Sequence, residues 1–223
     1  MKKIHTYIGI GGLLLLMAGA FLTSCQKDGG YKSYTKGVTQ IDANMYDYLK
    51  SQVGVFDSMV VVIDRIGLKR VMSNTQLTLF AVTNTSFKTA MRNLNVLREK
   101  EGLAPLSLAD LDQNNLDTLF CRYVVPGVYP TDSLVMYPDG RGINSIKYSR
   151  EVNLQLYTQT ASGYAGGGPA YIIYSDTKGS FYISKWIRAN TMSMDTYLRN
   201  GVLHILAEDH EFGFNEFINR FNK

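Results

Sequence analysis

The sequence predicts an α+β fold whose helices lie mostly in the N-terminal half and whose strands lie mostly in the C-terminal half. In the first half, apolar residues recur at steps of three and four, which is the period of an amphipathic helix. From Tyr129 onward, apolar and polar residues alternate, which is the period of a strand. Between these regions, the apolar run Leu77–Val82 predicts a strand that is covered on both faces.

Two helices are expected before the central strand, one around residues 45–49 and one over residues 56–67. After the strand, Thr83 and Asn84 carry side-chain oxygens that can accept hydrogen bonds from the first N–H groups of a helix. Phe87 is the first large apolar residue of that helix and is expected to fold back onto the strand. The stretch therefore predicts a strand followed directly by a helix.

Further along, Ser107 has the spacing of a cap for a short helix. The next predicted helix carries Leu116, Leu119, Phe120 and Tyr123 towards the core. It is expected to stop at Pro126-Gly127, because proline lacks a backbone N–H and glycine tolerates a reversal.

The predicted strands of the second half follow from alternation and from turn residues. They are expected around Leu134 and Met136 and over 152–156, 171–174, 181–187 and 202–206, with a less regular segment at 189–197. The glycine-rich segment 162–169 does not follow a strand and open a helix with phosphate-loop spacing, so it predicts a hairpin loop. Asn200-Gly201 is expected to supply left-handed backbone geometry before the last strand.

The chain begins with the layout of a secretory signal, because Lys2 and Lys3 precede an uncharged apolar run from Tyr7 to Leu22. The run is short and broken by glycines for a membrane span. It ends in Leu-Thr-Ser-Cys25, which resembles the lipobox of bacterial lipoproteins, and this resemblance implies a lipid such as palmitate on Cys25. The alternative is an ordinary signal peptide with a coincidental cysteine. Acyl chains on Cys25 are expected to hold the protein to a bilayer.

The segment after Cys25, residues 26–30, resembles in part the export signal that sends some Gram-negative lipoproteins to the cell exterior. A solvated linker is the alternative. The expected organisation is a signal peptide at 1–24, a lipid-anchored flexible tether at 25–40, a folded domain at 41–211 and an aromatic tail at 212–223. An outer-membrane location, facing the exterior or the periplasm, follows from this hypothesis.

Charge and cysteine content bear on nucleic-acid binding, disulfide formation and thiol chemistry. The formal charge of +4 falls to +2 once Lys2 and Lys3 leave with the signal, and no basic stripe with interleaved aromatics occurs, so nucleic-acid binding is not expected. Since an acylated Cys25 leaves Cys121 without an intramolecular partner, no disulfide is expected. Cys121 lies in an apolar neighbourhood without a histidine, which predicts a buried, inert thiol.

The central stretch Thr78–Asn84 with Phe87, together with Asn200–Leu206, resembles the two signature segments of the fasciclin (FAS1, beta-Ig-h3) domain. Residues 116–127 between them are similar to a third family element, and the resemblance covers about residues 41–209 in order. It implies a β-sandwich or wedge of two sheets with several helices packed at one edge. It also implies that Asn84 is a framework residue and that His204 is a strand histidine close to the core.

The sequence departs from the family pattern in two places. Tyr123 stands where the family has a histidine and Arg122 where it has a tyrosine, so the resemblance gives no support for integrin binding. The region 157–185 is longer than in minimal family members. Its tyrosines, Tyr164, Tyr171 and Tyr174, together with its glycine run, make it a candidate partner surface.

The aromatic tail offers a second candidate surface through Phe217 and Phe221, either as a docking helix for a partner or as a segment that packs on its own domain. The favoured function is a surface-anchored, non-catalytic binding or adhesion module that contacts another envelope protein, such as a SusC/SusD-type nutrient importer. The alternative is a lipoprotein that binds a glycan or a peptide directly.

No catalytic residue, cofactor or metal site is expected. Besides His5 in the signal, the chain has only His204 and His210, and neither has metal-ligand spacing around it. His204 lies among apolar residues, which favours a hydrogen-bonded structural histidine. Asp209, His210 and Glu211 follow the last strand as a polar cluster, which is interpreted as a solvated turn.

Overall fold

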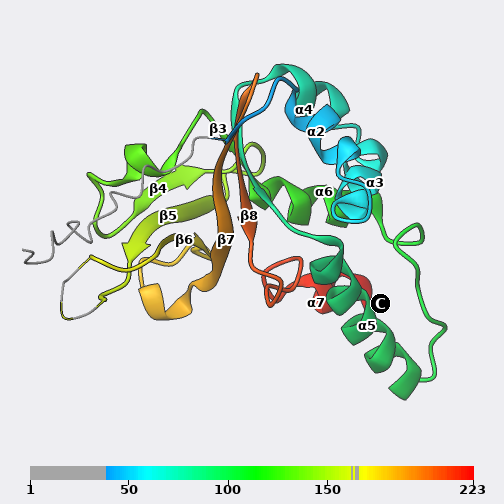
Figure 1. Ribbon diagram of the computed structural model, residues 1–223. Coiled ribbons are helices and arrows are strands. Elements are labelled where there is room, and N and C mark those ends of the chain that lie inside the picture. Colours follow the sequence, from blue (N-terminus) through cyan, green and yellow to red (C-terminus); the bar gives the residue numbers. More distant parts are fainter. Residues whose placement is uncertain (1–38, 162, 164–165) are drawn as a thin grey trace, which may run out of the picture. The chain divides into compact units, whose positions relative to one another are not determined.

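The computed structural model describes residues 39–161, 163 and 166–223 (Figure 1). The predicted signal peptide, the lipidation site Cys25 and most of the predicted tether lie outside these residues. The α-helices are α2 (Met45–Ser51), α3 (Asp57–Arg65), α4 (Lys69–Asn74), α5 (Asn84–Lys100), α6 (Gln113–Phe120) and α7 (Phe217–Phe221). Short 3-10 helices are η1 (Cys121–Tyr123), η2 (Thr131–Leu134) and η3 (Ile183–Lys185). None of the helices in the described part is long and apolar enough to span a membrane.

The strands form one mixed sheet in the order β3-β2-β8-β7-β6-β5-β4, with the short β1 paired to β7. Their bounds are β1 Thr39–Gln40, β2 Leu77–Ala81, β3 Val124–Pro126, β4 Arg141–Asn144, β5 Glu151–Thr158, β6 Ala170–Asp176, β7 Ile187–Leu198 and β8 Gly201–Leu206. The α+β class is therefore confirmed, with α6 and the earlier α-helices before most of the strands and, of the described α-helices, only α7 after them (Figure 1).

The long strand β7 joins the two parts of this sheet. Its first residues, Ile187–Asn190, pair with β6, whereas the register from Thr191 to Leu198 pairs with β8 and contains two shifts. Such bulges bend a strand and change its twist. The strands thus follow one continuous order through β7, and the predicted arrangement of two facing sheets is not confirmed.

The two segments that carry the resemblance lie side by side at the centre of the sheet. β2 is buried along its whole length and runs parallel to β8, with Leu79 opposite Leu203. Gly201 opens β8 because a Cβ atom there would lie 1.8 Å from the backbone oxygen of Leu77. The glycine is thus required by a close approach of two strands, in addition to its positive φ of 153°.

Three helices, rather than the two expected, precede β2, because residues 69–74 form α4. Asn200 holds these helices to the sheet. Its Oδ1 accepts a hydrogen bond from Met45 N at 2.8 Å at the start of α2, and its Nδ2 donates to the carbonyl oxygens of Met72 and Thr75 at 2.9 and 3.0 Å. One buried amide therefore satisfies the ends of two helices.

The helix predicted after β2 is α5, but its cap differs from the prediction. Asn84 Oδ1 accepts from Ser58 N at 2.8 Å and so caps α3 instead of its own helix, while Asn84 Nδ2 donates to the carbonyl oxygen of Gly54 at 3.0 Å. Thr83 occupies the cap position of α5 without a side-chain capping hydrogen bond. Asn84 is therefore a framework residue that ties α3 to α5 across 26 residues of sequence.

Residues 107–110 form a turn instead of the predicted short helix, because Ser107 donates from its N–H and hydroxyl to the Asp110 carboxylate at 2.7 and 2.6 Å. The following helix, α6, is capped by Asp112, whose side chain accepts from Asn115 N. It ends at Phe120, and Val124–Pro126 then pairs antiparallel with β2 as β3. The predicted helix was therefore too long at its C-terminal end.

The later strands are partly confirmed. β5, β6 and β8 contain the predicted strands at 152–156, 171–174 and 202–206. Three other predictions were wrong: Leu134 lies in η2 and Met136 in the loop after it, residues 181–186 form a loop with η3, and the segment 189–197 belongs to the long strand β7. The alternation at Leu134 and Met136 was too short to distinguish a strand from a loop.

The aromatic tail packs on its own domain. The rings of Phe212, Phe214 and Phe217 are fully buried, and Phe221 is nearly so. Phe212 stacks on Phe87 of α5 with the ring centroids 4.3 Å apart, and α5 and α7 are in contact (Figure 1). The domain therefore extends to the end of the described chain.

Candidate functional site

The structure places the predicted surface residues in very different environments. Cys25 and Tyr164 lie outside the described residues, and nothing structural follows for them. Tyr174 and Phe217 are fully buried and Phe221 is 6% exposed, so these three side chains belong to the core and offer no surface to a partner. Of the predicted tyrosines and phenylalanines, Tyr171 alone is described with a partly exposed side chain.

Tyr174 is buried because alternate residues of β6 face the core. Its ring stacks on Phe80 of β2 with the centroids 3.9 Å apart and an interplanar angle of 14°. Its hydroxyl donates to the carbonyl oxygen of Arg122, and burial raises its pKa well above the ordinary value. The residue therefore stabilises the contact between β6 and η1.

Tyr171 forms an aromatic pair at the outer end of the β5–β6 hairpin. It lies directly opposite Tyr157 in the register, and the ring centroids are 5.3 Å apart. Tyr157 is 44% exposed. Since β4 pairs with β5 only as far as Leu154, and β7 pairs with β6 only as far as Ile173, this end of the hairpin projects beyond the neighbouring strands. It presents an aromatic pair at the margin of the sheet.

The loop at the other end of β6, residues 177–186, is here termed the β6–β7 loop. It is held by its own hydrogen bonds: Ser180 N–H donates to the Thr177 carbonyl at 2.9 Å, and the indole N–H of Trp186 donates to the Ser180 carbonyl at 2.7 Å. Lys178 has a φ of 55°, which is uncommon for a residue with a Cβ. The tight geometry at the start of the loop is therefore supported by specific contacts.

Those contacts come from a charge network at the base of the loop. Asp176 is fully buried and accepts from Arg122 at 2.9 Å and from Arg150 at 2.7 Å. Glu216, in the tail, accepts from Arg122 at 2.6 Å and also pairs with Lys178. The network comprises Arg122, Arg150, Asp176, Lys178, Glu216 and Arg220. It joins η1, the ends of β5 and β6, and the tail.

The electrostatics of the network favour the ionised form of Glu216. Burial by itself raises the pKa of this carboxyl, but the hydrogen bonds from Arg122 and Lys178 outweigh that effect and hold the pKa well below its usual range. The network has four cations and two carboxylates, an excess of two positive charges. The base of the β6–β7 loop is therefore positively charged.

The tip of this loop is apolar and exposed. Phe181 is 97% exposed, Tyr182 is 75% exposed and Ile183 is 52% exposed. Single exposed apolar side chains are common, but three consecutive ones on a loop that is held in place are typical of a binding surface. These three residues are termed the loop tip. The turn residues on both sides of them, Lys-Gly-Ser before and Ser-Lys after, could have identified the loop from the sequence.

His210, interpreted from the sequence as part of a solvated turn, is in fact buried. Its Nε2 lies 2.9 Å from the Tyr123 hydroxyl, which accepts from Gly213 N–H at 2.8 Å. The tyrosine proton is thus available for His210 Nε2, and burial lowers the pKa of His210 to about 4. His210 therefore stays neutral near pH 7.

His204 is buried and hydrogen-bonded as predicted, with its Nδ1 accepting a hydrogen bond from Asp195 N–H.

The remaining candidates for chemistry are the Cys121 thiol and groups of possible metal ligands. Cys121 is buried and its pKa is raised by burial, in agreement with the inert thiol that was predicted. Among the described residues, no group of three or more histidine, cysteine, aspartate or glutamate side chains is arranged to hold a metal ion. The described surface thus offers the aromatic pair and the loop tip as candidate contact features.

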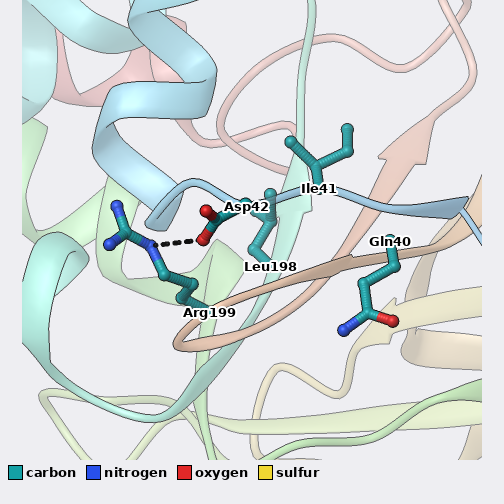
Figure 2. Close-up of a pocket in the computed structure, with 5 residues that line it drawn as sticks. All are labelled: Gln40, Ile41, Asp42, Leu198 and Arg199. Atoms are coloured by element: carbon teal, nitrogen blue, oxygen red, sulfur yellow. Dashed lines mark ion pairs between the residues drawn. The ribbon is translucent and has the colours of Figure 1, made fainter.

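A shallow hollow of about 480 Å³ lies beside β1 and the β7–β8 turn (Figure 2). It is lined by Gln40, Ile41, Asp42, Leu198 and Arg199. Its ion pair, between Asp42 and Arg199 at 3.4 Å, is largely exposed and contributes little to stability. Its lining has no Ser, Thr, Cys, Lys or His side chain.

No family profile and no curated protein sequence matches this chain. Among solved structures, the chain is similar to a FAS1 domain pair from the insect cell adhesion molecule fasciclin I, with a TM-score of 0.44 and 14% sequence identity. The match covers 77% of this chain and 46% of that chain, so the similarity extends over about half of the domain pair. At this TM-score and identity, the similarity gives no information on activity or partners.

Proposed function

We propose that the chain is a fasciclin-like, non-catalytic binding or adhesion module of the cell envelope, and that the projecting end of the β5–β6 hairpin is its contact surface. The observation that carries the proposal is the aromatic pair: Tyr157 is exposed, and its ring lies against Tyr171 at a place where β4 and β7 no longer flank the hairpin. Exposed tyrosines supply large contact areas at a small cost in conformational entropy.

The proposed partner is another outer-membrane protein, such as a SusC/SusD-type nutrient importer. The proposed anchor is a lipid on Cys25, supported by the lipobox-like residues before it. Radiolabelled palmitate should be incorporated into the full chain and should be lost in Cys25→Ser. Incorporation that survives this substitution would contradict the anchor without affecting the contact surface.

The contact surface is tested by placing a photo-crosslinking residue at position 159 of the full chain, an exposed position two residues from Tyr157, and recovering crosslinked proteins from detergent-solubilised outer membranes. A discrete partner is expected, and Tyr157→Ser should abolish its recovery, since the tyrosine ring supplies the contact. Tyr148→Ser is the matched control, because Tyr148 is an exposed tyrosine that precedes the opposite end of β5. Equal recovery of the partner from the crosslinker-bearing chain with and without Tyr157→Ser would contradict the proposal.

A second candidate function is direct binding of a glycan or a peptide. It is favoured by the same pair of tyrosine rings, because an exposed aromatic face can stack on the apolar face of a sugar ring. Isothermal titration of the chain with oligosaccharides and peptides distinguishes the two candidates. Heat of binding that Tyr157→Ser removes would favour direct capture.

A further inference from the structure

We propose that the β6–β7 loop inserts its tip into the headgroup region of an anionic lipid bilayer. The inference goes beyond the proposed function, which concerns the opposite end of β6, and it does not require lipidation of Cys25. It assigns a role to three consecutive exposed apolar residues of the described chain, Phe181, Tyr182 and Ile183.

The exposure of the loop tip favours a lipid surface over a groove on a protein. Phe181 is 97% exposed, so no neighbouring side chain shields any side of its ring. The three residues are consecutive: Phe181 and Tyr182 precede η3, and Ile183 is its first residue. A groove covers one side of a loop, whereas a bilayer surrounds a tip on all sides.

The loop is held in shape before it meets a membrane. Lys178 Nζ donates to the carbonyl oxygen of Phe214 at 2.8 Å and pairs with Glu216, which fixes the start of the loop to the tail. The indole N–H of Trp186 donates to Ser180, so this half-buried aromatic ring carries no unpaired donor towards lipid. Little conformational entropy remains to be lost on insertion.

The charge around the tip is complementary to phosphate-bearing headgroups. Residues 177–188 contain Lys178, Lys185 and Arg188 and no carboxylate. Lys185 is exposed two residues after the tip, and the charge network at the base of the loop has an excess of two positive charges. Arg188 lines a hollow together with the carboxylates of Asp209 and Glu211, so of the three basic residues it contributes least to the attraction of anionic headgroups. Basic residues behind exposed aromatic and aliphatic residues are typical of interfacial segments.

Insertion at this end leaves the proposed contact surface free. β6 has seven residues, with Ala170 next to the projecting end of the hairpin and Asp176 next to the β6–β7 loop. At about 3.3 Å per residue, the two ends of the strand are roughly 20 Å apart. A membrane at the loop tip and a partner at Tyr157 can therefore bind at the same time.

The only tryptophan of the chain provides the test, because Trp186 lies in this loop. The full chain is reconstituted into vesicles of phosphatidylethanolamine and phosphatidylglycerol and into vesicles of phosphatidylcholine, each with and without brominated lipid. We expect the Trp186 emission to shift to the blue and to be quenched by brominated lipid in the anionic vesicles, with weaker quenching in phosphatidylcholine.

The double variant Phe181→Ser/Ile183→Ser should lower the ratio of inserted to free loop at least about tenfold, because two apolar side chains no longer reach lipid. Lys185→Gln should lower it roughly fivefold in anionic vesicles only. The matched control is Val135→Ser/Met136→Ser, which removes two other exposed apolar side chains at 62% and 82% exposure and should change nothing.

Two results with lipid alone would overturn the proposal. One is Trp186 emission that brominated lipid does not quench in either kind of vesicle while the melting temperature shows a folded chain. The other is quenching that persists unchanged in Phe181→Ser/Ile183→Ser. Shielding of Trp186 by an added envelope protein instead of by lipid would assign the loop tip to a protein partner and would likewise contradict the inference.

Discussion

Asp176 and Phe181 are five residues apart in the chain, yet one is fully buried and the other is 97% exposed. Asp176 is held by Arg122 and Arg150, which come from other segments of the chain. Phe181 lies in a loop whose hydrogen bonds are mostly local. The comparison shows that long-range partners, and not residue type, decide which side chains of this region are buried.

The largest effect on the free energy of unfolding is expected when the buried residue, Asp176, is substituted. Asp176→Asn keeps the shape of the side chain but leaves Arg122 buried with less compensating charge, so unfolding should become easier by about 3–5 kcal/mol. Urea unfolding of the full chain measures this. Asp42→Asn is the matched control, since its exposed pair with Arg199 should contribute less than about 1 kcal/mol. Equal losses of unfolding free energy in both variants would show that the buried ion pairs of Asp176 contribute no more than an exposed pair, and would contradict this prediction.

Acid should weaken the domain in two steps. His210 has an ordinary pKa of 6.5 that burial lowers to about 4, so the unfolded chain binds a proton in this window that the folded chain does not. Stability is therefore full above about pH 6.5 and falls by up to about 3 kcal/mol as the pH drops to about 4. His210→Asn should remove this first step in unfolding curves recorded across that pH range. A first step that persists in the variant would rule out His210 as its source.

The second acid step belongs to Glu216, whose pKa is depressed in the folded chain. A depressed carboxyl pKa gives stability that is present above the unfolded pKa and is lost as the pH falls towards the folded one. Glu216→Gln should cost about 1–2 kcal/mol near neutral pH, less than Asp176→Asn, because Glu216 is 25% exposed and its pairs are screened by solvent. Thermal melting of the variant beside Glu101→Gln, another tail contact, checks the size of the loss.

The smallest effect on stability is expected on the exposed side of the comparison. The triple change of Phe181, Tyr182 and Ile183 to serine removes no buried contact, so the free energy of unfolding should change by no more than about 0.5 kcal/mol. The same denaturation curves test this. A loss comparable to that of Glu216→Gln would show that the loop tip packs on the domain, and it would weaken the case for a binding surface.

The sequence predicted the parts of the fold that have strong local signals. The run Leu77–Val82, the helix after it and the glycine at position 201 were identified correctly, because a continuous apolar run and a glycine before a strand are visible without tertiary contacts. Phe181–Ile187 was assigned to a strand because its residue types favour strands, and only the hydrogen bonds of Ser180 and Trp186 show a loop.

The candidate surface depended even more on tertiary structure. Tyr171 and Tyr174 look alike in the sequence, but the register of β6 against β5 and β7 places the first at the projecting end and the second on Phe80 in the core. A shift of one residue in that register would have exchanged their faces. The tail phenylalanines show the same dependence, because α5 covers them.

The amino-acid sequence by itself determined the α+β class and the apolar centre of the sheet, since periodicity and composition are local properties of the chain. Only the tertiary structure decided that Asn84 caps a different helix, that His210 is buried against Tyr123, and that the loop tip is exposed above a positively charged base. Each of these depends on residues that are distant in sequence. Local pattern carries no information about which of them meet.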